Sequence, residues 1–408
     1  MLYKPKEKSM LILIVCISSF FSLISFALWP VFLIELRYLW GLSNTEIGLI
    51  SGTYFLGYVL ATPILVGFTD KFDAKWIFIT GCLVAFFGNA GFVFFVKNFW
   101  TAILFWTLVG AGLAGTYMPG LQILNARLND HDRISAVPWY TSCFGLGTGA
   151  SYFVMGLMLT NFDYRFAAIV SSLSLLLSVS LILLFVKSKP VNIKLGYTMR
   201  HPLDFRPVFK KRESMSYILA YGAHTYELFA YRTWSFALLI FLVGRVDTPF
   251  GIGSVTIIVS LITVTGLLAS LVGAHLCLEL GRHRIIALIG AASVGMSCFA
   301  AFSLDGPIWL AITGLWVYNV FIMLDSGALT TGTVEAGNAH DRGALLAVHS
   351  MIGFGGGALG GPVVGYVLDR TGGVGTIDAW FYAVLAMGAG SAIVFFVQRY
   401  FWYQTPTH

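Results

Sequence analysis

The chain has 408 residues, of which 57% are hydrophobic and only 11% are charged. Soluble domains carry about 25% charged residues, so this composition excludes an ordinary soluble protein. The net charge of +6 comes from short basic islands between apolar runs, which argues against a nucleic-acid-binding surface. Runs of about 20 residues can cross a bilayer as helices, whereas barrel strands are shorter and alternate in polarity.

The apolar runs predict twelve membrane-spanning helices. In chain order they cover roughly residues 10–36, 45–68, 76–96, 101–124, 134–159, 165–186, 214–243, 252–276, 285–303, 307–330, 343–368 and 378–397. The first run is too long for the apolar part of a signal peptide, so we interpret it as a retained span. The predicted organisation is a six-helix bundle over 1–186, a basic linker over 187–213 with three prolines, and a second six-helix bundle over 214–408.

Basic residues predict the orientation of these spans, because they favour cytoplasmic loops. With twelve spans, both termini and the linker lie on one side, and that side holds most of the Lys and Arg residues. The exceptions are Arg37, Lys97, Arg165, Arg232, Arg245 and Arg370. We therefore expect a multi-pass protein of the bacterial inner membrane with both termini in the cytoplasm, and a linker that can lie against anionic lipid.

A charged pentapeptide occurs twice, as "NDHDR" at Asn129–Arg133 and as "NAHDR" at Asn338–Arg342. The first copy joins the fourth and fifth spans, and the second joins the tenth and eleventh. Six spans separate the copies, so the two halves have the same orientation, as in a parallel repeat. The predicted fold is therefore an all-α integral membrane protein of twelve transmembrane helices in two parallel-repeat six-helix bundles.

The pentapeptides are also candidate gates at the cytoplasmic side. Asp132 with Arg133, and Asp341 with Arg342, can pair within or between the halves when that side closes. Exposed ion pairs contribute only about 0 to 1 kcal/mol, which suits a reversible switch. The alternative is that these are ordinary solvated loop charges.

The loop between the second and third spans reads "VGFTDKFDAK" over Val66–Lys75. This resembles the G-x-x-x-D-R/K-x-G-x-R/K loop of the major facilitator superfamily. Asp70, Lys71 and Lys75 match the pattern, while Val66 and Asp73 replace its two glycines. The resemblance implies that Asp70, Lys71 and Lys75 form a gating charge network with neighbouring helix ends, and Asp70 would suit the start of the eleventh span because carboxylates favour helix N-termini. A plain solvated turn is the alternative.

The same resemblance implies a secondary transporter that works by alternating access, in which one bundle rocks against the other. Two departures from the family narrow the prediction. Many proton-linked members have an arginine in the fourth span, but the matching position falls near Trp106 and carries no arginine. The fifth span reads "GLGTGAS" and lacks the Gly-Pro pair of antiporters. Two segments, Gly41–Tyr58 and Leu324–Gly357, are similar in sequence to a permease group labelled nitrate/nitrite-like. However, the second and eighth spans lack the buried arginines of nitrate porters.

The seventh span carries the densest set of polar side chains inside the membrane, "YILAYGAHTYELFAYRTW" over Tyr217–Trp234. A charge at the centre of a span costs about 2.5 to 3.5 kcal/mol on insertion scales, so these residues indicate function or a structural partner. His224 and Glu227 share a helix face, and both residue types can load and release a proton. The guanidinium of Arg232 could instead bind an anionic solute. The alternative is a structural cluster that fixes the helix.

Further candidate site residues lie on neighbouring spans or on the same helix. Asp325 in the tenth span and His349 in the eleventh fall at similar depth, and they could pair as a second proton relay, or equally as a gate or packing pair. The predicted lining of the solute pathway consists of Tyr117, Trp316, Tyr318 and Asn319, while Tyr221 and Tyr231 extend the face of His224 and Glu227.

The leading functional prediction is proton-coupled transport of a small polar or anionic solute by a monomer, with protons and the lipid bilayer as further partners. Efflux of amphipathic compounds is an alternative, and so is a non-transporting sensor or assembly factor. We expect no enzymatic activity, cofactor or metal, because the sequence has no phosphate-binding GxxxxGK[ST] loop, no nucleophile–base set and no metal-ligand spacing. The five cysteines are predicted to be packing residues.

Overall fold

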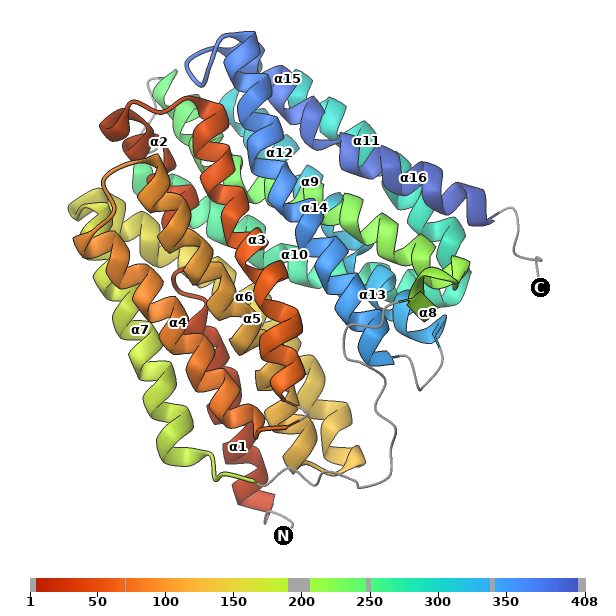
Figure 1. The fold of residues 1–408 in the computed structure, drawn as a ribbon. Coiled ribbons are helices and arrows are strands. Elements are labelled where there is room, and N and C mark those ends of the chain that lie inside the picture. Colours follow the sequence, from red (N-terminus) through yellow and green to blue (C-terminus); the bar gives the residue numbers. More distant parts are fainter. Residues whose placement is uncertain (1–4, 70, 190–205, 247–250, 338–341, 403–408) are drawn as a thin grey trace. The chain divides into compact units, whose positions relative to one another are not determined.

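The computed structural model describes residues 5–69, 71–189, 206–246, 251–337 and 342–402. Every regular element in these segments is a helix, as Figure 1 shows, and this confirms the predicted all-α fold. The helices are α1 (Pro5–Ser22), α2 (Leu28–Trp40), α3 (Asn44–Phe68), α4 (Ala74–Phe94), α5 (Phe99–Arg127), α6 (Asp130–Asn161), α7 (Tyr164–Phe185), α8 (Arg206–Phe209), α9 (Arg212–Gly244), α10 (Ile252–Leu280), α11 (Arg282–Ser303), α12 (Ile308–Leu324), α13 (Ser326–Glu335), α14 (Arg342–Thr371), α15 (Ile377–Met387) and α16 (Ala389–Trp402).

Within the described residues, eleven helical segments are long and apolar enough to cross a membrane. They correspond to the second through twelfth predicted spans, with α12 and α13 together forming the tenth and α15 and α16 together forming the twelfth. The predicted first span is the exception, because its helix is interrupted between α1 and α2. An unbroken helix over residues 10–36 is therefore wrong.

The interruption between α1 and α2 has a physical cause in the sequence. Pro30 has no N–H to donate, and its ring would clash with the carbonyl of Phe26 in a continuous helix. The backbone groups that the break leaves open are satisfied by one side chain of α6: the Ser151 hydroxyl accepts from the N–H of Ala27 (2.7 Å) and donates to the carbonyl of Ile24 (2.6 Å). A buried break without such partners would cost several kcal/mol in a bilayer.

The chain divides into two compact units. Unit 1 consists of Met1–Phe32 and Thr53–Pro202, and unit 2 consists of Leu33–Gly52 and Leu203–His408. The division falls inside α3, whose first residues therefore belong to unit 2. The predicted domain limits at residues 186 and 214 did not anticipate that the segment 33–52 would be grouped with the second half.

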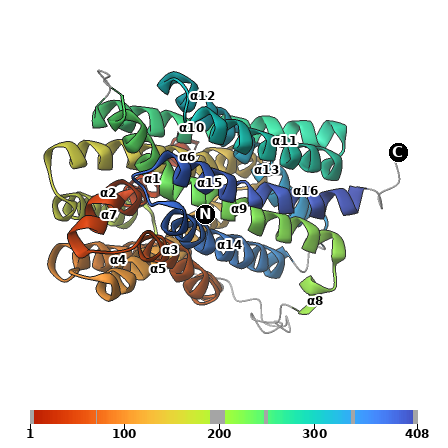
Figure 2. The same ribbon diagram turned by 90° about the horizontal axis from the view of Figure 1, so that it is seen from above.

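The two units repeat one pattern of helix contacts. In unit 1, α1 packs on α5, α6 and α7, and α4 packs on α5 and α7. In unit 2, α9 packs on α12, α14 and α16, and α11 packs on α12 and α16, as Figure 2 shows for α11 and α16. Each contact of unit 1 thus has a counterpart six spans later, in the same chain direction, as a parallel repeat requires.

Helix α9 is the most enclosed span of the protein. In the most apolar 18-residue window of α9, 83% of the residues are buried, whereas the other spans reach at most 56%. Part of this cover is α14, which lies along α9 in Figure 1. Glycines make the close approach possible, because a Cβ at Gly356 would collide with the backbone carbonyl of Gly222 and one at Gly360 with that of Tyr226.

The first turn of α3 is held to the end of α14 by a carboxylate. Both oxygens of Asp369 accept hydrogen bonds from Asn44 and Thr45, through the backbone N–H and the side chain of each residue, at 2.6 to 3.0 Å. The carboxylate thereby satisfies N–H groups that a helix start leaves without intrahelical partners. This contact belongs to unit 2 and explains why the start of α3 is grouped there.

Candidate functional site

The two units differ in what their interiors contain. In the described part of unit 1, the buried charged side chains are Lys75 and Arg127, which lie at helix ends. Trp106 occupies the middle of α5, packed among the rings of Trp29, Tyr54 and Phe92 with centroids 5.3 to 6.1 Å away. The described part of unit 2 instead buries six acidic, basic or histidine side chains, namely His224, Glu227, Arg232, His283, Asp325 and His349.

Glu227 lies at the centre of this set and is only 1% exposed. Its Oε1 accepts hydrogen bonds from the hydroxyls of Ser293 on α11 (3.2 Å) and Tyr318 on α12 (2.6 Å). Its Oε2 accepts a hydrogen bond from Ser391 on α16. A buried carboxylate is tolerated only when its oxygens are satisfied in this way. Glu227 therefore links α9 to three other helices through hydroxyl groups.

Hydroxyl partners also allow Glu227 to exist in either protonation state. Each hydroxyl can donate to a carboxylate, or rotate and accept a hydrogen bond from a protonated carboxyl. Backbone N–H groups, by contrast, can only donate, and would hold the group ionised. The partners of Glu227 thus fit a side chain that gains and loses a proton.

His224 lies one turn before Glu227, and its partner is Asp325. The imidazole Nδ1 is 2.7 Å from Asp325 Oδ1, and both side chains are almost fully buried. Asp325 is the residue between α12 and α13. Its backbone keeps right-handed helical dihedrals (φ −89°, ψ −14°), and the tenth span continues past it as one apolar helical segment.

His349 is placed beside His224 but does not pair with Asp325. Its Nε2 and Nδ1 lie 3.3 Å and 3.2 Å from the hydroxyls of Thr330 and Thr333. The predicted Asp325–His349 pair is therefore wrong, because the carboxylate faces His224 and two threonines of α13 occupy both imidazole nitrogens. The ring of His349 instead stacks on that of Tyr221, with centroids 3.8 Å apart.

Tyr221 completes a stack of three rings. Its ring is nearly parallel to that of His349 (17°) and to that of His224 (20°, centroids 5.7 Å apart). Gly353 of α14 makes room for it, because a Cβ there would strike the Tyr221 ring. The stack fixes the orientation of His224.

The remaining predicted site residues are placed differently. The Tyr231 hydroxyl donates to the carbonyl of Leu315 (2.9 Å), and the Asn319 amide donates to the carbonyl of Ile262 (2.9 Å). Arg232 is buried, with its guanidinium 5.9 Å from the Phe229 ring centre. Tyr117 belongs to unit 1, where it packs on Tyr140 and Phe144. Tyr231 and Asn319 are thus engaged in helix-to-helix bonds.

The predicted gating loop contains a network that the sequence did not reveal. Asp73 caps α4 by accepting from the N–H of Lys75, and its Oδ2 lies 2.6 Å from Nη2 of Arg127 at the end of α5. Arg127 also donates to the carbonyl of Lys187 (2.9 Å), and Lys75 donates to the carbonyls of Leu183 and Val186. These basic groups cap the end of α7, as expected for cations at helix C-termini.

The other predicted gating residues are placed as follows. Lys71 is exposed, Asp70 and Asp341 lie outside the described residues, and only the backbone of Arg342 is described, as the first residue of α14. Asp132 pairs with Lys8 of α1 at 2.6 Å, a partner other than the predicted Arg133. Arg133 makes other contacts.

Asp73→Ala is expected to lower the free energy of unfolding by about 3 kcal/mol or more, because it leaves the guanidinium of Arg127 buried without its carboxylate. The matched control is Lys8→Met, which breaks the more exposed pair with Asp132 and should cost less than about 1 kcal/mol. Thermal denaturation of the purified variants measures both. Equal losses of stability in the two variants would show that the buried pair contributes no more to stability than the exposed pair.

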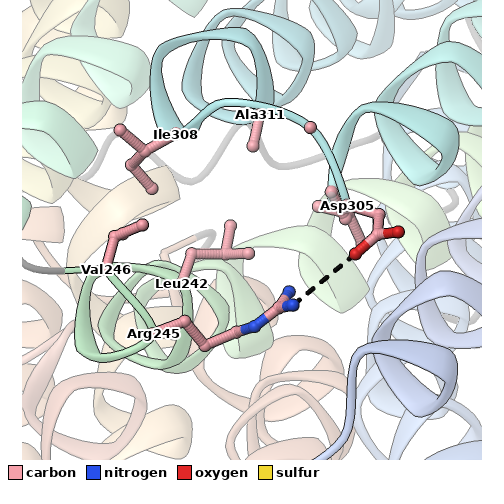
Figure 3. Close-up of a pocket in the computed structure, with 8 residues that line it drawn as sticks. Leu242, Arg245, Val246, Asp305, Ile308 and Ala311 are labelled. Carbon is pink, nitrogen blue, oxygen red and sulfur yellow. Dashed lines mark ion pairs between the residues drawn. The ribbon is translucent and has the colours of Figure 1, made fainter.

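The described residues contain no group of three or more His, Cys, Asp or Glu side chains that could hold a metal ion. A pocket of about 170 Å³ lies at the carboxyl end of α9 and the α11–α12 connection, as Figure 3 shows. There Arg245 and Asp305 form an exposed pair at 3.5 Å. His224, Glu227 and Asp325 are not among the residues that line this pocket, so it is separate from the buried set.

A family model described as Major Facilitator Superfamily matches residues 14–361. The chain belongs to the major facilitator superfamily. No curated protein sequence matches the chain significantly. Solved structures of superfamily transporters share the fold: a variant of the nucleoside transporter NupG aligns with a TM-score of 0.78 and 16% identity, covering 96% of this chain and 99% of the other.

A second superfamily structure gives a similar result. The bacterial homologue of the human lysosomal transporter Spinster, in an inward-facing and unoccupied conformation, aligns with a TM-score of 0.77 and 15% identity. The alignment covers 99% of this chain and 100% of the other. At these identities the likeness establishes the superfamily fold alone, and the multi-pass character of this member agrees with its eleven apolar helical segments.

The superfamily membership accounts for the repeat and the transporter architecture. The buried set of unit 2 was predicted from the sequence except for His283, whereas the contacts within the set came from the structure. Ser293 and Ser391 were missed as partners of Glu227 because single serines are common in membrane helices. The pairing of His224 with Asp325 was missed because the sequence does not show which side chain of another helix faces Asp325. Asp73 and Arg127 were missed because the family pattern has a glycine at the Asp73 position.

Proposed function

We propose that this member of the superfamily is a secondary transporter that moves a small polar solute by alternating access and couples the movement to protons. The observation that supports this best is Glu227, a fully buried carboxyl group whose partners are hydroxyls from α11, α12 and α16. A carboxyl group with such partners can take up and release a proton without losing its hydrogen bonds. His224, beside it, is the other group that can carry the proton.

The proposed setting is the bacterial inner membrane, with the termini and the linker in the cytoplasm. The distribution of basic residues along the sequence supports this orientation. The proposed gating residues at the cytoplasmic side belong to both halves. They are Asp70, Lys71, Lys75, Asp132 and Arg133 in the first half, and Asp341 and Arg342 in the second. The Asp73–Arg127 pair adds a rigid element to that end of unit 1.

The solute is proposed to be small and polar, because the interior of unit 2 offers charged and hydroxyl groups rather than an apolar surface. The nucleoside transporter NupG has the same fold, so nucleosides are a reasonable first class to test. Efflux of amphipathic compounds is less well supported, since it would use an apolar pathway.

Proteoliposomes containing the purified protein test the proposal. Uptake of a radiolabelled solute, with uridine as the first probe, should exceed its equilibrium level when an inward proton gradient is imposed and should fall to that level when an ionophore removes the gradient. Uptake that ignores the gradient would contradict proton coupling. The absence of uptake for any of a broad set of solutes would favour the sensor alternative.

A further inference from the structure

Within its described residues, unit 2 contains three buried histidines, and they differ in how their ring nitrogens are satisfied. His349 has both nitrogens beside threonine hydroxyls, and His283 has its nitrogens beside the Tyr217 hydroxyl (3.0 Å) and the Gln398 amide oxygen (2.6 Å). His224 has Asp325 at Nδ1, but its Nε2 is buried without a hydrogen-bond partner among the described residues. His224 is thus the exception.

An open nitrogen at this position requires an explanation. A buried polar atom without a partner costs about 1 to 3 kcal/mol, so it persists in a native structure where function requires it. The surroundings also hold the ring in place, with Asp325 on one nitrogen and the Tyr221–His349 stack against its face. A fixed ring with one nitrogen left open is arranged as a ligand-binding group.

The chemistry of the pair determines what the open nitrogen can bind. Nδ1 of His224 lies 2.7 Å from Asp325 Oδ1, and a carboxylate at that distance favours the tautomer with its hydrogen on Nδ1. In the neutral ring, Nε2 is then an acceptor, and its partner must donate an O–H or N–H group. Asp325 lies 2.7 Å from the ring, and Glu227 follows His224 by three residues on α9. Carboxylates beside the open nitrogen disfavour an anion there.

We propose that Nε2 of His224 is a solute-binding atom, and that the solute is neutral with a hydroxyl or N–H group that donates to it. Asp325 is a positioning residue that holds the ring and its tautomer, and His349 is a positioning residue that acts through Tyr221. This inference rests on the proposed function for the existence of a solute. It departs from the sequence-based expectation that Arg232 binds an anion.

Equilibrium binding to the purified full-length protein tests the solute class. The neutral probes are uridine and myo-inositol, and the anionic probes are nitrate and L-lactate. At least one neutral probe is expected to raise the melting temperature and to bind measurably by calorimetry, while the anions do neither. Binding of the anions alone, or of none of the neutral probes, would overturn the proposal.

A comparison of probe and residue then tests the atom. For the neutral probe that binds, one of its mono-deoxy or N-methyl analogues should bind the wild type at least ten-fold more weakly than the parent. In His224→Phe, which keeps a ring but has no nitrogen, parent and analogue should bind equally. His224→Gln, whose amide can still bond to Asp325, provides a second variant if the first folds poorly.

The matched control is His349→Phe, which removes two nitrogens that already have protein partners. It is expected to keep the ten-fold preference for the parent, even where overall affinity falls. Loss of the preference in His349→Phe and its retention in His224→Phe would contradict the assignment. Binding without a gradient does not depend on proton coupling, so a failure of gradient-driven uptake would refute the proposed function and leave this result intact.

Discussion

Glu227→Gln is expected to abolish solute accumulation driven by a proton gradient, reducing the initial rate at least ten-fold, while exchange of solute across the membrane continues. The amide has nearly the same size and can still bond to the hydroxyls of Ser293, Tyr318 and Ser391. It cannot gain or lose a proton. The loss of coupling would therefore come from chemistry and leave the packing of α9 largely intact.

Counterflow measures this separation. Proteoliposomes loaded with unlabelled solute take up labelled solute without net proton movement, so the variant should match the wild type in this assay and differ only under a gradient. Glu279→Gln is a suitable control, since this carboxyl group is 58% exposed and lies in the last turn of α10. Gradient-driven accumulation at the wild-type rate in Glu227→Gln would disprove the role of Glu227, and loss of counterflow as well would indicate a structural role.

Gly356→Ala and Gly355→Ala are expected to change stability in opposite directions, although the chemical change is identical. At Gly356 the added methyl group would meet the backbone carbonyl of Gly222 on α9, whereas nothing lies within 4 Å of the same position at Gly355. Overpacking of a close helix contact costs about 1 to 3 kcal/mol. Alanine also has a helix propensity up to about 1 kcal/mol better than glycine, and only Gly355→Ala gains this without a clash.

Melting temperatures of the two purified variants, measured in the same detergent, provide the comparison. Gly356→Ala should melt below the wild type and Gly355→Ala at or above it. A shared shift in either direction would mean that the contact between α9 and α14 adapts freely. Because α14 also stacks His349 on Tyr221, a shift of α14 at Gly356 should weaken solute binding as well.

Much of the fold was predictable because a bilayer restricts membrane-spanning segments to helices or closed barrels. The bilayer requires apolar segments of a fixed minimum length, so their limits could be read from hydropathy. The repeated pentapeptide, at Asn129 and Asn338, then gave the parallel arrangement that the helix contacts of the two units bear out. The break after Ser22 escaped prediction because the apolar run continues through it, and hydropathy alone does not show where a helix is interrupted.

The residues of the candidate site were largely predictable, whereas the contacts between its helices were not. The spacing of Tyr221, His224 and Glu227 on α9 follows from helical periodicity, and their burial follows from their place in a span. Their partners come from other helices, and one sequence contains no information about which faces meet. The pairing of Asp325 with His224, and not with His349, depends on how the helices pack in three dimensions, which hydropathy does not record.

The unequal interiors of the two units have a consequence for how the protein tolerates mutation. The ring cluster around Trp106 in unit 1 is held by shape, and apolar exchanges of similar volume usually cost less than about 1.5 kcal/mol. The interior of unit 2 contains paired polar groups. Removal of one partner leaves the other buried without a partner and destabilises the fold by about 3 to 5 kcal/mol. Sequence drift should therefore accumulate faster in the heart of the first half, so that two copies of one architecture evolve at different rates.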